Sequence, residues 1–170
     1  MKKLSLYIFS LLLILTIGLC SCGIYSFSGA SLSTDIKTVT IKTFTNQASI
    51  VFPSLSEKIT EKLKDKFMKE MNLKLVDDNG DITFKGAVVD YKIMPSSIST
   101  NNQSKTSRLT ISVKVRFENT KDPKASYETL FSNYMDFDSS KDLTQVENDL
   151  VDGITDLLVQ DIFNKAVNNW

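Results

Sequence analysis

The chain has 170 residues, 42% hydrophobic and 24% charged, which suits one globular domain with a sizeable core and excludes wholesale disorder. Its 20 basic and 20 acidic residues leave no net positive field to concentrate nucleic acid, so we expect no nucleic-acid partner. With no histidine and only two cysteines, it lacks the commonest general base and metal ligand, so we expect no catalysis, no cofactor and no metal.

The N-terminal segment has the pattern of a secretory signal. Residues 1–3 are positively charged at Lys2 and Lys3, and residues 4–19 form an apolar run. This run is shorter than the roughly 20 residues that a membrane-spanning helix needs. A basic start, a short apolar run and then small residues are typical of a signal peptide.

The end of this segment, Leu19-Cys20-Ser21-Cys22, resembles a bacterial lipobox. In such signals the last cysteine receives a diacylglyceryl group, and cleavage occurs just before it. Cys22 fits the modified position because Ser21 is small, whereas bulky Leu19 would sit at the cleavage point for Cys20. We predict a lipoprotein signal peptide at residues 1–21 and a single mature domain at 22–170. An ordinary signal peptide with two incidental cysteines is the alternative.

The residues after Cys22 indicate a location. Gly23 is not the aspartate that resembles an inner-membrane retention signal, and no acidic run typical of surface export follows. We therefore predict an outer-membrane protein that faces the periplasm and is held in the membrane through an acyl anchor on Cys22.

The first half of the mature chain predicts a strand and a helix. Residues 36–44 are rich in β-branched side chains and predict a strand, followed by a loop at 46–53. Ser54 with Glu57 predicts a capped helix start. Five apolar residues then recur at a spacing of four and predict a helix lying on a sheet: Leu55, Ile59, Leu63, Phe67 and Met71.

The acidic run at 77–81 is a candidate for a calcium-binding loop. That motif needs oxygen ligands at alternating positions, a glycine sixth and a glutamate twelfth, and no register of this segment supplies all three. A plain turn is therefore favoured.

The second half predicts three more strands and a second helix. Residues 82–94 alternate in two phases, which predicts a strand with a bulge next to Gly86. A polar loop at 95–107 precedes strands at 108–119 and 126–137. Thr144 with Glu147 predicts the helix cap, before an apolar stripe formed by Val146, Leu150, Val151, Ile154, Leu157, Leu158 and Ile162.

These elements predict an α+β fold with the order β-α-β-β-β-α. Two helices packed on one face of a four-stranded mixed sheet are the simplest way to bury both apolar stripes. The β-α-β start implies a parallel crossover, and the later strands are predicted to form antiparallel hairpins.

The whole pattern resembles the LptE family of lipopolysaccharide-assembly lipoproteins, in its Bacteroidetes-type branch. The resemblance depends on the lipobox, the element order and the length, together with four segments: residues 25–29 (YSFSG), 52–56 (FPSLS), 109–115 (LTISVKV) and 161–170 (DIFNKAVNNW). It covers essentially the entire mature chain. No single segment is diagnostic, because none is a catalytic signature.

The resemblance implies a function. Members of that family sit as a plug inside an LptD-type outer-membrane β-barrel, assist its assembly and help deliver lipopolysaccharide to the cell surface. Described members bind the glycolipid, and basic residues are implicated in this. The resemblance therefore implies two partners, the barrel and lipopolysaccharide, and it assigns one position residue by residue, the acylated Cys22.

The basic residues of the predicted sheet are candidate glycolipid contacts. Lipopolysaccharide presents phosphates and carboxylates beside acyl chains, which suits Lys and Arg near apolar surface. Three of the candidates share one face of the predicted strand at 108–119, and the others lie on the neighbouring strand and in the polar loop. The candidates are Lys85, Lys92, Lys105, Arg108, Lys114 and Arg116. The alternative is a solvated outer face carrying ordinary strand cations.

Two other functions stay open. One is a generic periplasm-facing lipoprotein that scaffolds another cell-envelope complex. The other is a hydrolase with a Ser-Lys pair, which needs no histidine. Ser54 and Lys58 are the candidates for that pair, but they are four residues apart rather than three, and they lack glycine-rich surroundings for an oxyanion hole.

Overall fold

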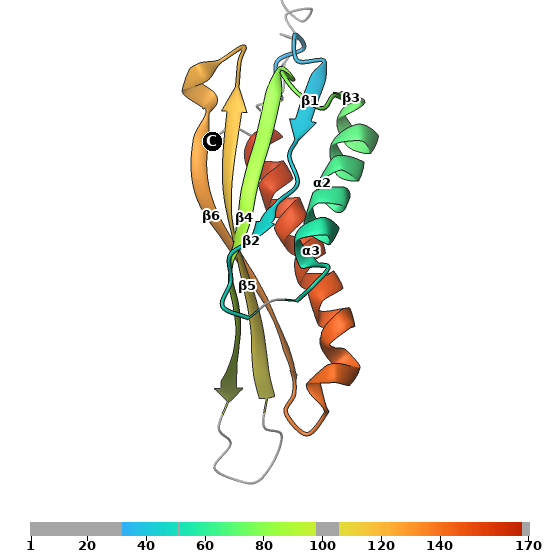
Figure 1. Cartoon of the computed structure of the whole chain (residues 1–170), viewed down its shortest axis with the longest axis vertical. Helices are drawn as coiled ribbons and strands as arrows, with labels where there is room; N and C mark the ends of the chain where they lie inside the picture. Colours follow the sequence, from blue (N-terminus) through green and yellow to red (C-terminus); the bar gives the residue numbers. More distant parts are fainter. Residues whose placement is uncertain (1–31, 51, 98–105, 168–170) are drawn as a thin grey trace, which may run out of the picture.

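The computed structural model describes residues 32–50, 52–97 and 106–167. They form one mixed sheet of six strands with both long helices on the same side of it (Figure 1). This confirms the predicted α+β class and the placement of the helices. The sheet has six strands rather than four because two short strands, of two residues each, join its longer ones. The predicted signal peptide, Cys22 and Lys105 lie outside the described residues.

The strands follow the order β3-β1-β4-β5-β6, with β2 pairing to β4 beside this path. The pairs β1–β3, β1–β4 and β2–β4 are parallel, whereas β4–β5 and β5–β6 are antiparallel, as the sequence predicts for the later strands. The strands are β1 (Thr38–Ile41), β2 (Thr45–Asn46), β3 (Lys74–Leu75), β4 (Ile82–Ser97), β5 (Thr106–Asn119) and β6 (Tyr127–Asp138); the helices are α2 (Leu55–Met71), the 3-10 turn η1 (Pro123–Ala125) and α3 (Leu143–Val167).

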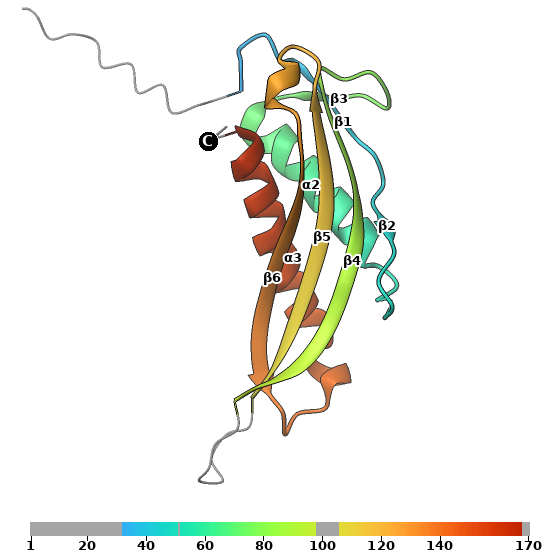
Figure 2. The same ribbon diagram turned by 90° about the vertical axis from the view of Figure 1, so that its left-hand side faces the viewer.

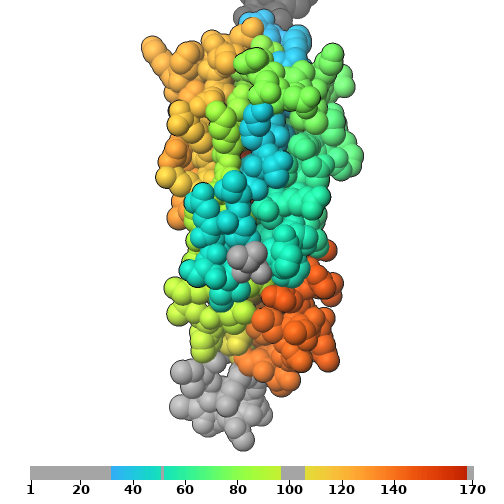
Figure 3. Space-filling view, viewed as in Figure 1, coloured from blue at the N-terminus to red at the C-terminus, as the bar shows by residue number. Residues whose placement is uncertain are grey.

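Of the strand predicted at 36–44, only Thr38–Ile41 forms a strand, β1, and β2 follows at Thr45–Asn46, just beyond the predicted end. Between them Phe44 turns inward and is buried, and its backbone N–H donates to Thr60 Oγ1 on α2 at 3.0 Å. Its ring lies directly against Gly86 of β4, where a Cβ would come within 2.3 Å of a ring carbon. The chain therefore leaves the regular ladder to bury an aromatic ring over a glycine. In the space-filling view this cyan segment runs down the front of the molecule beside α2 (Figure 3).

The predicted bulge in β4 exists but lies further along the strand. The pairing with β5 shifts register between Val88 and Asp90, two residues beyond Gly86. Val88 and Tyr91 are both buried, so the bulge returns the apolar residues to the inner face after the change of phase. Gly86 has a different role, because it makes room for Phe44.

The central strand β5 has the predicted alternation. Its five apolar residues, Leu109, Ile111, Val113, Val115 and Phe117, are all buried. They face the helices, and the core is continued by aromatic contacts: Phe84 lies 5.0 Å from Phe117 and 4.9 Å from Phe67 of α2, between ring centres. One apolar layer therefore joins the sheet to the helices.

Both helices begin where the sequence indicates, but neither uses the predicted capping box. Ser54 occupies the N-cap of α2 without a side-chain hydrogen bond. At α3 the cap is Asp142, whose Oδ1 accepts from the backbone N–H of Thr144 at 3.0 Å. Glu147 instead accepts a hydrogen bond from the hydroxyl of Tyr91 at 2.5 Å and so ties the helix to β4.

Ion pairs join the outer surfaces of the two helices. Lys58 Nζ lies 2.7 Å from Asp152, and Lys62 Nζ lies 2.6 Å from Asp156. Lys58 thus has a structural partner on α3. In the apolar stripe of α3 one predicted core residue, Leu157, is 46% exposed, because it falls on the side of the helix turned away from the sheet.

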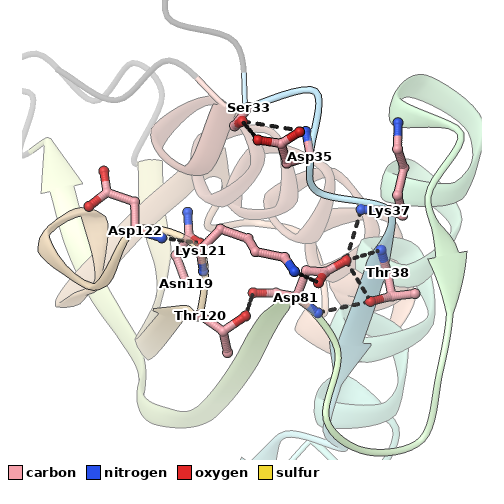
Figure 4. Close-up of polar contacts among 9 residues, drawn as sticks. All are labelled: Ser33, Asp35, Lys37, Thr38, Asp81, Asn119, Thr120, Lys121 and Asp122. Carbon is pink, nitrogen blue, oxygen red and sulfur yellow. Dashed lines mark hydrogen bonds and ion pairs between the residues drawn. The ribbon is translucent and has the colours of Figure 1, made fainter.

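The acidic run at 77–81 ends in a structural carboxylate. Asp81 Oδ2 accepts hydrogen bonds from the backbone N–H groups of Lys37 and Thr38 and from Thr38 Oγ1, at 2.9 to 3.0 Å. Its other oxygen lies 3.1 Å from Lys121 Nζ (Figure 4). Asp81 therefore fastens the start of β1 to the start of β4 and to the turn after β5. No group of three metal-ligating side chains occurs in the described part of the chain.

The N–H of Lys37, with Lys121 and the Thr38 hydroxyl, holds the pKa of Asp81 well below its usual range. A carboxylate with a lowered pKa stabilises the fold above its unfolded-state pKa of about 4 and loses this effect as the pH falls further. We expect Asp81→Asn to lower the urea midpoint at neutral pH, with a difference from the wild type that shrinks below about pH 4.

Denaturation curves at several pH values measure this effect. Asp35→Asn is the matched control, because Asp35 is exposed and its carboxylate, among the described residues, accepts a single long hydrogen bond of 3.4 Å from the Ser33 hydroxyl. A difference between wild type and Asp81→Asn that stays constant down to about pH 2 would contradict the role of the ionised carboxylate.

Candidate functional site

The sheet face turned away from the helices carries five of the predicted site residues. Arg108, Lys114 and Arg116 alternate along β5 with its buried residues, so they share this outer face. Lys85 of β4 stands directly opposite Arg116. Lys92 stands opposite Thr110, which places it on the same face, because the bulge has shifted the phase of β4. Lys105 lies outside the described residues.

Three of these cations surround a shallow hollow of about 320 Å³ on the outer face. Lys85 comes from β4, and Lys114 and Arg116 come from β5. Gly86 and Ala87 line it with little side-chain bulk, and the remaining lining residues are Thr45, Gln47 and Glu128. The hollow exists where β2 meets β4 and where β4 presents the small side chain of Ala87 on its outer face.

Carboxylates already contact each cation of the hollow. Lys114 Nζ lies 2.5 Å from Glu128 of β6, and this hydrogen bond lowers the pKa of Glu128. Glu118 is shared, with one oxygen 2.8 Å from Arg116 Nε and the other 3.4 Å from Lys85 Nζ. Three cations face two carboxylates, so the group carries a formal excess of one positive charge. It can attract an anion, which must compete with two internal partners.

The other two cations lie apart from the hollow. Arg108 is six residues from Lys114 on the same strand, which corresponds to about 20 Å. Its guanidinium makes two hydrogen bonds with Asp136, at 2.8 and 3.0 Å, and stacks 3.6 Å from the ring centre of Tyr134. Lys92 makes no ion pair with any described residue. The structure thus divides the predicted set into a hollow group and a distal pair.

Sequence reasoning missed the other half of the hollow. Glu118 lies on the same face of β5 as Arg116, so its proximity could have been found from the alternation alone. Glu128 belongs to β6, and its place beside Lys114 depends on the register of the β5–β6 hairpin. Thr45 and Gln47 reach the hollow because β2 pairs with β4. A two-residue strand has no periodic pattern in the sequence from which this pairing could be predicted.

In the described part of the chain, no helix is both long enough and apolar enough to cross a membrane. The fold and the outer face together define a class: a two-layer α+β domain that presents an ion-paired sheet surface opposite its helices.

The family model of LptE, described as lipopolysaccharide-assembly, matches residues 36–166. This stretch begins just before β1 and ends within the last turn of α3. The chain therefore belongs to the LptE family, as its resemblance predicts. A comparison with the curated proteins finds no match.

Solved structures share the fold at low sequence identity. Uncharacterized lipoprotein B from Nitrosomonas europaea matches with a TM-score of 0.52 at 14% identity, covering 78% of this chain and 83% of that one. A hypothetical protein from Chlamydia trachomatis gives 0.53 at 9%, with 76% and 95% covered. A putative neuraminyllactose-binding hemagglutinin homolog from Helicobacter pylori gives 0.53 at 9%, with 83% and 88% covered. These likenesses show the architecture and nothing of the ligand.

Proposed function

We propose that this protein is an outer-membrane lipoprotein that plugs and helps assemble an LptD-type β-barrel and assists the delivery of lipopolysaccharide to the cell surface. The observation that carries the proposal is the family match over residues 36–166, which includes every described strand, all of α2 and all of α3 but its last residue. The absence of histidine from the whole sequence fits a role that positions a barrel and a lipid without catalysis.

The hollow is the part of the molecule that fits the charged portion of a glycolipid best. Phosphates are bound most strongly by charge-assisted hydrogen bonds, and a guanidinium offers paired donors to them. Arg116 and Lys114 project from one strand and Lys85 faces them from the next, so a phosphate would meet cations from two strands. Glu118 and Glu128 would release part of their contact when the anion binds.

The remaining candidates extend this surface. Arg108 and Lys92 would meet a second anionic group about 20 Å further along the sheet. Leu130 lies directly opposite Lys114 on β6 and is 59% exposed, so it offers apolar surface beside the hollow. We propose Lys105 as a further contact on sequence grounds alone, and Cys22 as the acylated anchor.

Isolation of the complex tests the proposed partner. We expect affinity purification of the tagged protein from detergent-solubilised outer membranes to yield an LptD-type barrel in roughly equal amount, because a plug and its barrel form a lasting interface. Mass spectrometry of the eluate identifies the partner. Depletion of the protein should lower both mature barrel and surface lipopolysaccharide. An eluate with other envelope proteins and no such barrel would favour the generic scaffold instead.

The proposed anchor has its own test. We expect Cys22→Ala to leave the protein unacylated and in the soluble periplasmic fraction, because no acyl chain then holds it in the membrane. Cys20→Ala is the matched control and should stay in the membrane. Fractionation followed by immunoblotting measures both variants. Membrane retention of Cys22→Ala would contradict the lipid anchor.

Charge reversal in the hollow tests glycolipid binding. We expect Lys114→Glu with Arg116→Glu to weaken binding of purified lipopolysaccharide about tenfold or more, because two of three cations become anions. Lys64→Glu with Lys69→Glu on α2 is the control, since these lysines pair with acids within their own helix. Circular dichroism verifies folding. Equal binding by both double variants would favour a merely solvated face.

A further inference from the structure

The free edge of β6 is the longest unpaired edge of the described sheet. β6 is the last strand in the sheet order, and it pairs with β5 without a register shift from Tyr127 to Asp138. At the opposite edge the last strand is β3, which has only two residues. Figure 2 turns the β6 edge toward the viewer, and no other described element crosses in front of it. Within the described part of the chain, the twelve residues of β6 therefore have no strand paired to them on this side of the sheet.

β6 lacks most of the devices that keep exposed edges from pairing with other chains, and its only charges are the outward carboxylates of Glu128, Asp136 and Asp138. Such edges usually carry a lysine, a proline, a bulge or an inward-pointing charge, or are very short. The sequence of β6, YETLFSNYMDFD, contains no lysine and no proline. Its side chains on the inner face are Tyr127, Thr129, Phe131, Asn133, Met135 and Phe137, none of which is charged. An edge of this kind is a template for an added strand.

The outer side chains of β6 specify what such a strand would carry. At alternate positions they read Glu128, Leu130, Ser132, Tyr134, Asp136 and Asp138. Leu130 is 59% exposed and Tyr134 is 51% exposed, so two apolar residues lie between the carboxylates of Glu128 and Asp136, with Asp138 at the end of the strand. No cation occurs on this strand.

The neighbour that β6 already has shows the matching chemistry. On β5, Arg116 stands directly opposite Glu128, and Arg108 stands directly opposite Asp136. Opposite charges at facing positions stabilise a strand pair, and like charges destabilise it. A strand added to the free edge would meet the same two carboxylates from the other side.

This charge pattern argues against a second copy of the chain as the occupant. Two β6 strands could pair antiparallel with Leu130 of each opposite Tyr134 of the other. That register places Glu128 opposite Asp136 at both ends, so like charges face each other twice. The apolar residues match in such a dimer, and the charged residues do not.

We propose that the β6 edge receives a β-strand of a partner protein whose alternate outer side chains read basic, apolar, any, apolar, basic. Backbone hydrogen bonds would supply affinity, and the side-chain pattern would supply selectivity. The inference rests on the proposed function only for the identity of the partner. Under that function, the added strand belongs to the LptD-type barrel.

Amide hydrogen exchange tests the added strand. The exchange of the full mature protein is measured alone, in its isolated barrel complex, and with two synthetic peptides. One peptide has the basic-apolar-any-apolar-basic pattern, and the control peptide has glutamate at both basic positions. We expect the barrel and the basic peptide to slow exchange at alternate β6 amides about tenfold, with β5 amides unchanged and little effect of the control peptide.

A double variant tests the selectivity. Glu128→Gln with Asp136→Asn should abolish the preference for the basic peptide while keeping the side-chain size. Asp65→Asn with Glu70→Gln on α2 is the matched control, because these exposed carboxylates also have lysine partners, and it should keep the preference.

Several outcomes would overturn the inference. Unprotected β6 amides in a complex that contains the barrel would do so while leaving the proposed function intact. Equal protection by both peptides, or by neither, would also do so. Protection that rises with the concentration of the protein alone would assign the edge to a second copy. A complex without the barrel would remove the proposed function, and the peptide comparison would then decide the inference by itself.

Discussion

The two-residue period of β5 is the constraint on which the rest of the structure depends. With Leu109, Ile111 and Val113 turned toward the helices, every intervening residue must face the opposite way. The helices can then cover only one face of the sheet, and the basic residues Lys114 and Arg116 are confined to the other. The core and the charged surface are therefore two results of a single alternation, and a register slip of one residue would exchange them.

The bulge in β4 keeps that constraint consistent in the neighbouring strand. Before it Val88 points inward, and after it Tyr91 does. An unbroken strand would turn Lys92 into the core and expose Tyr91, at the cost of a buried unpaired charge. One inserted residue thus places the hydroxyl of Tyr91 beside Glu147 of α3 and leaves Lys92 in solvent.

The elements that the sequence predicts well are those with a long periodic pattern. β5 and both helices have such a pattern, and the structure confirms them. β2 and β3 could not be predicted because two-residue strands have no period. The exact position of the bulge could not be predicted because the glycine in this strand, Gly86, makes room for Phe44 and does not mark the bulge. The hollow was half predictable: Lys114 and Arg116 share a strand, whereas Glu128 reaches them only through the register of a hairpin. Both capping boxes failed, because the side-chain bonds depend on local backbone angles.

The parallel placement of β1 has a consequence for the order of folding. β4, β5 and β6 are joined by sequential antiparallel hairpins, whose contacts are local and form early. β1 must wait for β4, since Thr38 meets Asp81 across 43 residues of chain. A chain made from its N-terminus presents β1 first and can dock it only after α2 and the start of β4 have appeared. We therefore expect β1, the first described strand, to join the sheet late, with the carboxylate of Asp81 securing it to the start of β4.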